Sequence, residues 1–472
     1  MKIGSFTESL AKKLVAKYPL TGPYYTSYPS VGQWDGQFKD ESFISALDDL
    51  FVADGNAPLS LYLHYPFCPE LCTYCSCHVI ISNDQDRMDH FLSYIFKEID
   101  ILRDYFNSKS ITPNIKEIHL GGGSPSVISR KGFERLVAKL GTLVDVKTLK
   151  HFAIEVDVRT VDKEMMEFYH DQGINRVSFG VQDFNPDVQE AVNRVQPVEM
   201  VEKVIPLDVR KRFKSINFDI LWGLPFQTRE TFRETINTLK RISPDRVTLL
   251  HYGHFPDIFK HQVKINESDI PSEFERFMFN IEAISDLESS GYEWIGLDHI
   301  AKKNDEMVGW KNEHRLNRGF IGYTCEYANL IGLGPSALSS FGKYFGQNTY
   351  GLSDYYAAVD KGIFPTFRGY ECSSDILIRS KVISELINYS FLNFRDIENK
   401  FEVDFHNYFD RELGCMDELI DDGLVELTES SIKVTTMGRY FVRHICMIFD
   451  IFLQKKSAHK PTSRRDSKLV MS

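Results

Sequence analysis

One loop of this chain reads Cys68-Pro69-Glu70-Leu71-Cys72-Thr73-Tyr74-Cys75-Ser76-Cys77, directly after the apolar run Leu61-Tyr62-Leu63-His64-Tyr65. The loop holds four of the eight cysteines of the sequence. Thiolates crowded this closely either collect a metal or exchange electrons with one another. An ordinary cubane [4Fe-4S] cluster takes four cysteines. The spacing of Cys68, Cys72 and Cys75 predicts that these three hold such a cluster and leave its fourth iron bare.

Two other interpretations of the loop are weaker. A structural zinc site would normally add a second cysteine pair about a dozen or more residues away, and the sequence has no such pair. A disulfide knot would require a secretory context, but residues 1–6 contain no apolar run long enough for a signal peptide. We therefore favour the cluster over zinc or redox thiols.

The composition narrows the class of protein. A chain of 472 residues with 43% hydrophobic residues can form a large catalytic domain and one smaller domain. Its net charge of −11 argues against nucleic acid as a partner. No stretch approaches the roughly 20 apolar residues of a membrane span, so we expect no membrane association. The other cysteines are scattered, as in a reducing compartment, and we predict a cytoplasmic protein.

Short apolar runs alternate with amphipathic stretches from about residue 58 to about residue 290. The runs at 59–65, 115–120, 152–156, 176–180, 216–221 and 246–250 predict strands. The stretches at 88–106, 131–143, 162–171, 228–241 and 272–287 predict helices. Alternating β and α units indicate a parallel sheet, and six in a row indicate an α/β fold with an incomplete parallel (β/α)6 barrel.

We predict five segments along the chain. They are an N-terminal segment packing on the barrel (1–57), the partial barrel (58–290), a glycine-rich irregular region that completes the site (291–364), a smaller, mostly helical C-terminal domain (365–455) and a disordered basic tail (456–472). Within the C-terminal domain, residues 423–427 and 432–434 predict a small hairpin after helices, as in winged-helix domains.

In parallel barrels the functional loops lie at the carboxyl-terminal ends of the strands. A candidate site segment ends or follows each of the six predicted strands. In chain order these segments are the cysteine loop, the turn at 121–125, Glu155 with Asp157, residues 180–184, Asp219 with 223–225, and residues 251–254. The chemically suggestive residues are therefore expected to lie along one edge of the sheet. Simpler interpretations remain: Glu155 could form an ion pair with Arg159 or Arg176, and Gln182 and Asp183 could cap the helix that begins near Pro186.

The cysteine loop resembles that of the radical S-adenosylmethionine (SAM) enzymes. In these enzymes the bare iron chelates SAM, and the reduced cluster releases a 5′-deoxyadenosyl radical. Beyond the loop, the chain resembles the oxygen-independent coproporphyrinogen III oxidases (coproporphyrinogen dehydrogenases) nearly end to end. The matching segments are 25–29, 62–77, 121–125, 180–185, 192–197, 223–225 and 436–450.

The resemblance implies roles for individual residues and two SAM molecules bound side by side. Cys68, Cys72 and Cys75 would hold the cluster. The SAM on the cluster would contact Tyr62, Tyr74, Gly122, Glu155 and Leu338, and the second SAM would be framed by Gly123, Ser124, Gln182, Arg194, Asp219 and Gly253. Tyr62 and Cys77 are the candidate catalytic residues, and Arg194 can clamp a carboxylate in bidentate fashion.

The implied reaction is the oxidative decarboxylation of coproporphyrinogen III, a tetrapyrrole, to protoporphyrinogen IX in haem synthesis. A monomer reduced by a flavodoxin or ferredoxin is expected. The chain departs from the family at Tyr24 and around residues 317–321, where substrate carboxylates could be recognised. Arg318, Lys311 and Arg315 are candidate anchors for them. Two alternatives are a related radical SAM enzyme that methylates or opens a tetrapyrrole and a non-enzymatic haem-binding or haem-delivery protein.

Overall fold

The computed structural model describes residues 2–3, 6–325 and 329–458. Its internal contacts divide the chain into two compact units, each built from separate stretches of sequence. The larger unit contains residues 35–291 and 327–370, and the smaller contains residues 1–34, 292–326 and 371–472. The predicted N-terminal segment 1–57 is thus divided between the two units. The boundaries of the other predicted segments stay predictions.

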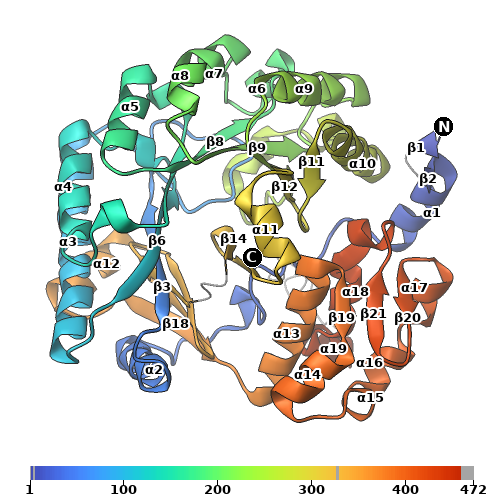
Figure 1. The fold of residues 1–472 in the computed structure, drawn as a ribbon. Helices are drawn as coiled ribbons and strands as arrows, with labels where there is room; N and C mark the ends of the chain where they lie inside the picture. The colour runs from blue at the N-terminus through green and yellow to red at the C-terminus, as the bar shows by residue number, and fades with distance from the viewer. Residues whose placement is uncertain (1, 4–5, 326–328, 459–472) are drawn as a thin grey trace. The chain divides into compact units, whose positions relative to one another are not determined.

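The larger unit is organised around a sheet whose central strands are all parallel (Figure 1). The six predicted strands are β3 (Pro58–Tyr65), β6 (Asn114–Gly122), β7 (His151–Val156), β8 (Arg176–Gln182), β9 (Ser215–Trp222) and β10 (Arg246–His251). They pair in the order β10-β9-β8-β7-β6-β3. This is the sheet of an incomplete parallel barrel, and it confirms the predicted fold class.

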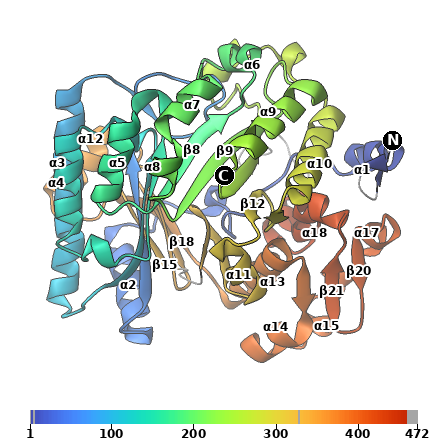
Figure 2. The same ribbon diagram turned by 45° about the horizontal axis from the view of Figure 1, so that its top comes forward.

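Helices follow these strands in the chain, as right-handed parallel connections require. They are α3 (Gln85–Ser108), α4 (Arg130–Leu140), α5 (Lys163–Asp171), α9 (Arg229–Ile242) and α10 (Glu273–Ser289). Figures 1 and 2 show α3, α4 and α5 side by side on one face of the sheet. In α3 the apolar side chains recur at helical spacing, so Phe91, Leu92, Ile95, Ile99 and Leu102 are all fully buried.

The connection from β8 to β9 consists of three short helices, α6 (Pro186–Ala191), α7 (Val198–Val204) and α8 (Leu207–Arg210). Each begins at a proline, either in the first turn or at the N-cap. Proline fits the start of a helix and interrupts its interior, so the three prolines divide this stretch.

The sheet extends beyond β3, where the sequence predicted an irregular region. Strand β15 (Asn329–Leu333) pairs with β3 in parallel, and β16 (Leu338–Phe341), β17 (Tyr344–Asn348) and β18 (Thr366–Glu371) follow in order. The prediction of irregular structure was wrong for β15 to β17, and β18 lies in the stretch predicted as the helical C-terminal domain. Strands β15, β16 and β17 are short and separated by turns that contain glycine, so their alternation is too brief to recognise. Helices α2 (Asp40–Ala53) and α12 (Leu352–Asp360) complete this unit.

The smaller unit is mostly helical in its C-terminal part. Its elements are β1 (Lys2–Ile3), β2 (Phe6–Thr7), α1 (Glu8–Lys17), β11 (Tyr292–Trp294), β12 (His299–Lys302), α11 (Glu306–Asn312), β13 (Leu316–Gly319), β14 (Gly322–Cys325), α13 (Ser374–Tyr389), β19 (Phe391–Asn393), α14 (Phe394–Phe401), α15 (Phe405–Tyr408), α16 (Asp410–Gly414), α17 (Asp417–Asp421), β20 (Val425–Leu427), β21 (Ser431–Val434), α18 (Val442–Ile448) and α19 (Ile451–Ala458). Strands β20 and β21 pair antiparallel, which confirms the predicted hairpin.

Distant parts of the sequence meet inside the smaller unit. The Tyr25 hydroxyl donates a hydrogen bond to Asp450 at 3.1 Å. Arg443 donates from Nη1 to the carbonyl of Gly22 at 3.0 Å. The first and last described stretches therefore form one core. Of the predicted basic tail, residues 456–458 belong to α19 and residues 459–472 lie outside the described residues. No helix in the described part of the chain combines the length and apolar character needed to cross a bilayer.

Candidate active site

The predicted site residues follow strands that run in the same direction, so the structure brings them to one edge of the sheet. The cysteine loop follows β3, the turn at 121–125 ends β6, and Glu155 lies near the end of β7. Gln182 ends β8 at a bulge in its pairing with β9, and its φ is +68°. Leu338, far along the sequence, reaches this edge because it begins β16 just after β15, the parallel neighbour of β3.

Backbone contacts from several elements hold the cysteine loop in place. Thr73 N–H donates to the carbonyl of Val192 at 3.0 Å, and Asn193 donates from Nδ2 to the carbonyl of Leu71 at 3.0 Å. His261 donates from Nε2 to the carbonyl of Cys75 at 2.6 Å. The loop is therefore positioned by the segments that follow β8 and β10 as well as by β3.

The thiols of the loop lie in different electrostatic surroundings. Cys68 Sγ lies 3.5 Å from the Ser124 hydroxyl, and burial raises the pKa of the Cys68 thiol to about 12. Cys72 Sγ accepts from Arg194 at 3.6 Å and from Arg159 at 3.8 Å. A hydrogen bond from Cys77, whose side chain is exposed, lowers the pKa of Cys75 to about 7.

This donor set fits a cubane cluster better than a single metal ion. Among the described residues, no three His, Cys, Asp or Glu side chains converge as ligands of one ion. A cubane takes one thiolate on each iron, so its ligands stand apart from each other. Arginines beside Cys72 suit an anionic thiolate, and iron binding would deprotonate all three thiols.

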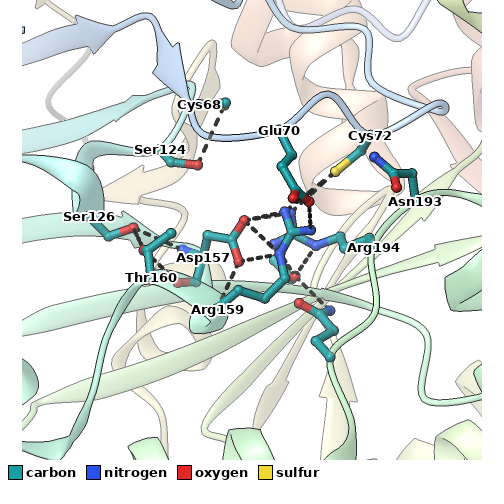
Figure 3. A network of polar contacts seen from close by, with 12 residues as sticks. Cys68, Glu70, Cys72, Ser124, Ser126, Asp157, Arg159, Thr160, Asn193 and Arg194 are labelled. Atoms are coloured by element: carbon teal, nitrogen blue, oxygen red, sulfur yellow. Dashed lines mark hydrogen bonds and ion pairs between the residues drawn. The ribbon is translucent and has the colours of Figure 1, made fainter. Parts of the chain in front are cut away.

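Arg194 and Arg159 approach Asp157 from two sides, below Cys72 (Figure 3). Arg159 Nη2 lies 2.7 Å and Arg194 Nη1 lies 3.0 Å from Asp157 Oδ2. Burial raises the pKa of Asp157, but the two guanidinium groups outweigh it and hold the pKa below its usual range. Arg194 also donates to the carbonyl of Gly180 at 2.7 Å. Since Arg194 already binds these groups, its clamp on a SAM carboxylate stays a prediction.

The close partner of Glu155 is His119, whose Nε2 lies 2.9 Å from the carboxylate, whereas Arg159 pairs with Asp157. Glu155 also accepts a hydrogen bond from Gly122 N–H at 3.2 Å. Burial raises the pKa of Glu155, but the His119 and Gly122 contacts outweigh it and lower the pKa overall. Glu155 therefore presents an ionised carboxylate beside the glycine turn. Gly122 itself has a φ of +113°, which an L side chain rarely adopts.

Tyr62 lies next to the Glu155 carboxylate and forms a hydrogen bond with His64. Burial lowers the pKa of His64 to about 4, so the imidazole is neutral at pH 7. Its Nε2 faces the carbonyl of His78 at 2.9 Å, and a carbonyl can only accept, so Nε2 carries the proton. His64 Nδ1 must then accept from the Tyr62 hydroxyl at 3.1 Å.

A buried polar network, which the sequence did not reveal, joins three turns at this edge. Asp183 is 1% exposed and accepts hydrogen bonds from Gln227 at 2.6 Å and from Thr235 at 2.8 Å. Gln227 accepts from the N–H of Leu224 at 2.9 Å and from that of Gly223. Asp183 is thus not the cap of α6, whose N-cap is Asn185.

The remaining predicted residues have the following places. Asp219 accepts from Ser178 at 2.9 Å and from Asn217 at 2.8 Å. Tyr74 packs on the apolar cluster around Leu224 and Tyr252. An ideal Cβ on Gly123 would come within 2.7 Å of the Phe67 carbonyl oxygen, so only glycine fits there without a shift. Gly253 follows β10 by two residues.

The three predicted basic anchors belong to the smaller unit, and each is paired with an acid of the chain. Arg318 lies 3.1 Å from Asp298, and both side chains are buried. Lys311 lies 2.9 Å from Glu293, and Arg315 lies 2.7 Å from Glu313. These contacts give the cations partners within the protein.

The comparisons with known proteins agree with this geometry. A family model described as the radical SAM superfamily matches residues 62–239, the region of the cysteine loop and the central strands. The solved structure titled coproporphyrinogen III oxidase from Escherichia coli, a radical SAM enzyme, matches with a TM-score of 0.86 and 36% identity, covering 91% of this chain and 98% of that one.

Curated relatives extend the match at the sequence level. Oxygen-independent coproporphyrinogen III oxidase from Pseudomonas aeruginosa is 36% identical over 443 residues, covering 93% of this chain and 95% of the relative. The Escherichia coli protein of the same name is 35% identical over 452 residues, covering 96% and 97%. The chain belongs to the family of oxygen-independent coproporphyrinogen III oxidases. Membership implies a [4Fe-4S] cluster and SAM as cofactors.

Proposed function

We propose that this chain catalyses the oxidative decarboxylation of coproporphyrinogen III to protoporphyrinogen IX. In this reaction a hydrogen atom leaves the β-carbon of a propionate side chain, and loss of CO2 and one electron then leaves a vinyl group. Two propionates react in this way. The observation that carries the proposal is the near full-length match to relatives of that name.

We assign the cluster to Cys68, Cys72 and Cys75. When bound, the reduced cluster and SAM supply a 5′-deoxyadenosyl radical for hydrogen abstraction. The first SAM is assigned to Tyr62, Tyr74, Gly122, Glu155 and Leu338. A second SAM is assigned to Gly123, Ser124, Gln182, Arg194, Asp219 and Gly253. Support for these assignments comes from their common position at the carboxyl-terminal edge of the parallel strands.

The surrounding residues have distinct tasks in this proposal. Ionised Glu155 can accept hydrogen bonds from the amino group or a ribose hydroxyl of SAM, and His119 keeps it in place. Arg159 and Arg194 offset the negative charge that gathers at Cys72. Tyr62 and Cys77 are the proposed catalytic residues; Cys77 exposes its side chain next to Cys75.

The cellular location, the oligomeric state and the partners of the protein are also proposals. We infer that the protein acts as a cytoplasmic monomer on a tetrapyrrole substrate and receives electrons from a flavodoxin or ferredoxin. Nucleic acid is not an expected partner, since the net charge is −11. Membrane association is not expected either, since no stretch of the sequence approaches the roughly 20 apolar residues of a membrane span.

Anaerobic reconstitution with iron and sulfide, followed by incubation with SAM, reductant and coproporphyrinogen III, tests the function. The expected products are protoporphyrinogen IX, two CO2 per porphyrinogen and cleaved SAM. Methyl transfer to the tetrapyrrole or opening of its ring would instead support a related radical SAM enzyme. Stable haem binding without SAM turnover would support a delivery protein.

A further inference from the structure

Arg276, on α10, reaches the same edge of the sheet and contacts two neighbouring strand ends. Its Nη1 donates to Nε2 of His251, the last residue of β10, at 3.1 Å. An arginine can only donate, so His251 Nε2 accepts and carries no proton. The aliphatic part of Arg276 lies over Gly223, which follows β9: an ideal Cβ on Gly223 would come within 2.7 Å of Arg276 Cδ.

The charge of Arg276 lacks a close acidic partner among the described residues. Its hydrogen-bond partner is the imidazole of His251, and its buried Nε has no partner at all. Burial lowers the pKa of Arg276, and Glu273, one turn earlier on α10, only partly offsets this.

Several other arginines with buried or half-buried side chains are balanced by carboxylates, and others, such as Arg210 and Arg443, donate to backbone carbonyls. Arg159 and Arg194 pair with Asp157, Arg229 with Glu282, Arg318 with Asp298, and Arg379 with Glu412. Burial of an unpaired charge is costly, so a half-buried cation without an acid suits a site that receives an anion from outside the chain.

The position of Arg276 indicates that this anion is a carboxylate. His251 and Gly223 end the two strands that carry Asp219 and lead to Gly253, both assigned above to the second SAM. The ligands proposed for this edge carry carboxylates: the propionates of coproporphyrinogen III and the methionine part of SAM. Arginine is the side chain best suited to bind a carboxylate through two parallel hydrogen bonds.

We propose that Arg276 is a carboxylate-binding residue of the active site, held at the ends of β9 and β10 by its hydrogen bond to His251. This inference rests on the proposed function for the identity of the ligand. The carboxylate comes either from the tetrapyrrole substrate or from SAM, and the two sources can be separated experimentally.

Equilibrium binding to the reconstituted protein tests the proposal without turnover. The probes are coproporphyrin III, the oxidised tetrapyrrole with the same four carboxylates, and SAM. Arg276→Met is expected to weaken one of the two by about ten-fold or more, as for loss of a charged hydrogen bond. Arg276→Lys keeps the charge but cannot form two parallel hydrogen bonds, so it is expected to bind more weakly than the wild type and more tightly than Arg276→Met. Arg233→Met is the matched control, since Arg233 on neighbouring α9 is half-exposed and paired with Glu282.

Each outcome decides the question. Weaker coproporphyrin III binding with unchanged SAM binding assigns Arg276 to the substrate, and the reverse assigns it to the cofactor. If neither changes while cluster content and melting temperature match the wild type, the proposal is overturned. Should Arg276→Met fold poorly, Arg276→Gln, which keeps hydrogen-bonding capacity without the charge, replaces it. If the wild type binds both probes but does not decarboxylate, the proposed function fails while the test of Arg276 still holds.

Discussion

Serine differs from cysteine by a single atom, so it tests cluster ligation with little change in shape. Cys68→Ser, Cys72→Ser and Cys75→Ser are each expected to abolish the brown colour of the cluster and the cleavage of SAM, since iron in these clusters is held by thiolates. Visible absorbance, iron content and SAM cleavage after anaerobic reconstitution provide the measurements. Cys415→Ser, at an exposed cysteine outside the loop, serves as the control. A Cys72 variant with wild-type iron and SAM cleavage would contradict the ligand assignment.

A substitution of Glu155 provides a second test at the level of single residues, this time of the SAM site. Glu155→Gln keeps the size of the side chain and removes the negative charge of the carboxylate, which lies 2.9 Å from His119 Nε2. We expect SAM affinity to fall about ten-fold or more while the iron content stays unchanged, because a charged acceptor is lost. A SAM-binding titration measures this, with exposed Glu134→Gln as control. Unchanged affinity would remove Glu155 from the SAM site.

Single residues also show which features of the site could be predicted from the sequence and which could not. The cysteines were recognisable because their spacing is local. The partners of Glu155 and the placement of Arg276 were not, because His119 and His251 come from other strands. Such partners depend on the register and packing of the whole sheet, which no local pattern contains.

At the scale of elements, the network around Asp183 and Gln227 holds the turn at 223–225 against the end of β8. Gln227→Ala leaves a buried carboxylate oxygen and two backbone N–H groups without their partner. We expect the unfolding free energy to fall by about 3 kcal/mol and the affinity for the second SAM to decrease, since each buried unsatisfied group is costly. Denaturant unfolding and SAM titration check this, with exposed Gln85→Ala as control. A stable variant with normal SAM stoichiometry would show that the network is dispensable.

The elements themselves were largely predictable. The predicted strands match β3, β6, β7, β8, β9 and β10 to within two residues at each end, because their apolar runs and flanking turns are local signals. Strands β15 to β17 were missed, since strands of four or five residues carry too little pattern. Their membership of the sheet depends on pairing with β3, more than 250 residues earlier in the chain.

At the scale of the whole molecule, the buried carboxyl group of Glu98 is expected to make the stability of the fold depend on pH. Glu98 is fully buried, and burial raises its pKa to about 7 although Tyr355, Gly334 and Asn348 donate hydrogen bonds to it. Its pKa is higher in the folded state than in the unfolded one, so the folded state binds the proton more tightly. The stability from this group is therefore complete below pH 4.5, the unfolded value, and is lost as the pH rises through 7.

We thus expect the melting temperature to fall between about pH 4.5 and pH 7 partly because of Glu98. Glu98→Gln cannot ionise and should show a flatter profile over this range, even if its melting temperature is lower overall. Asp157, whose pKa is lowered by its arginines, affects only more acidic solutions. Thermal melting of both proteins across the range gives the comparison. Parallel profiles would mean that Glu98 does not titrate there.

The contacts of Tyr25 with Asp450 and of Gly22 with Arg443 also bear on synthesis of the protein. A ribosome releases the chain in order, so Gly22 and Tyr25 emerge more than 400 residues before these two partners. Strand β3 likewise waits for β15. The smaller unit therefore cannot close until residues near Asp450 have emerged, whereas the larger unit, which holds the cysteine loop, has all its residues by residue 370 of 472 and can close while translation continues. An iron–sulfur carrier could thus meet a finished cysteine loop before the chain is released.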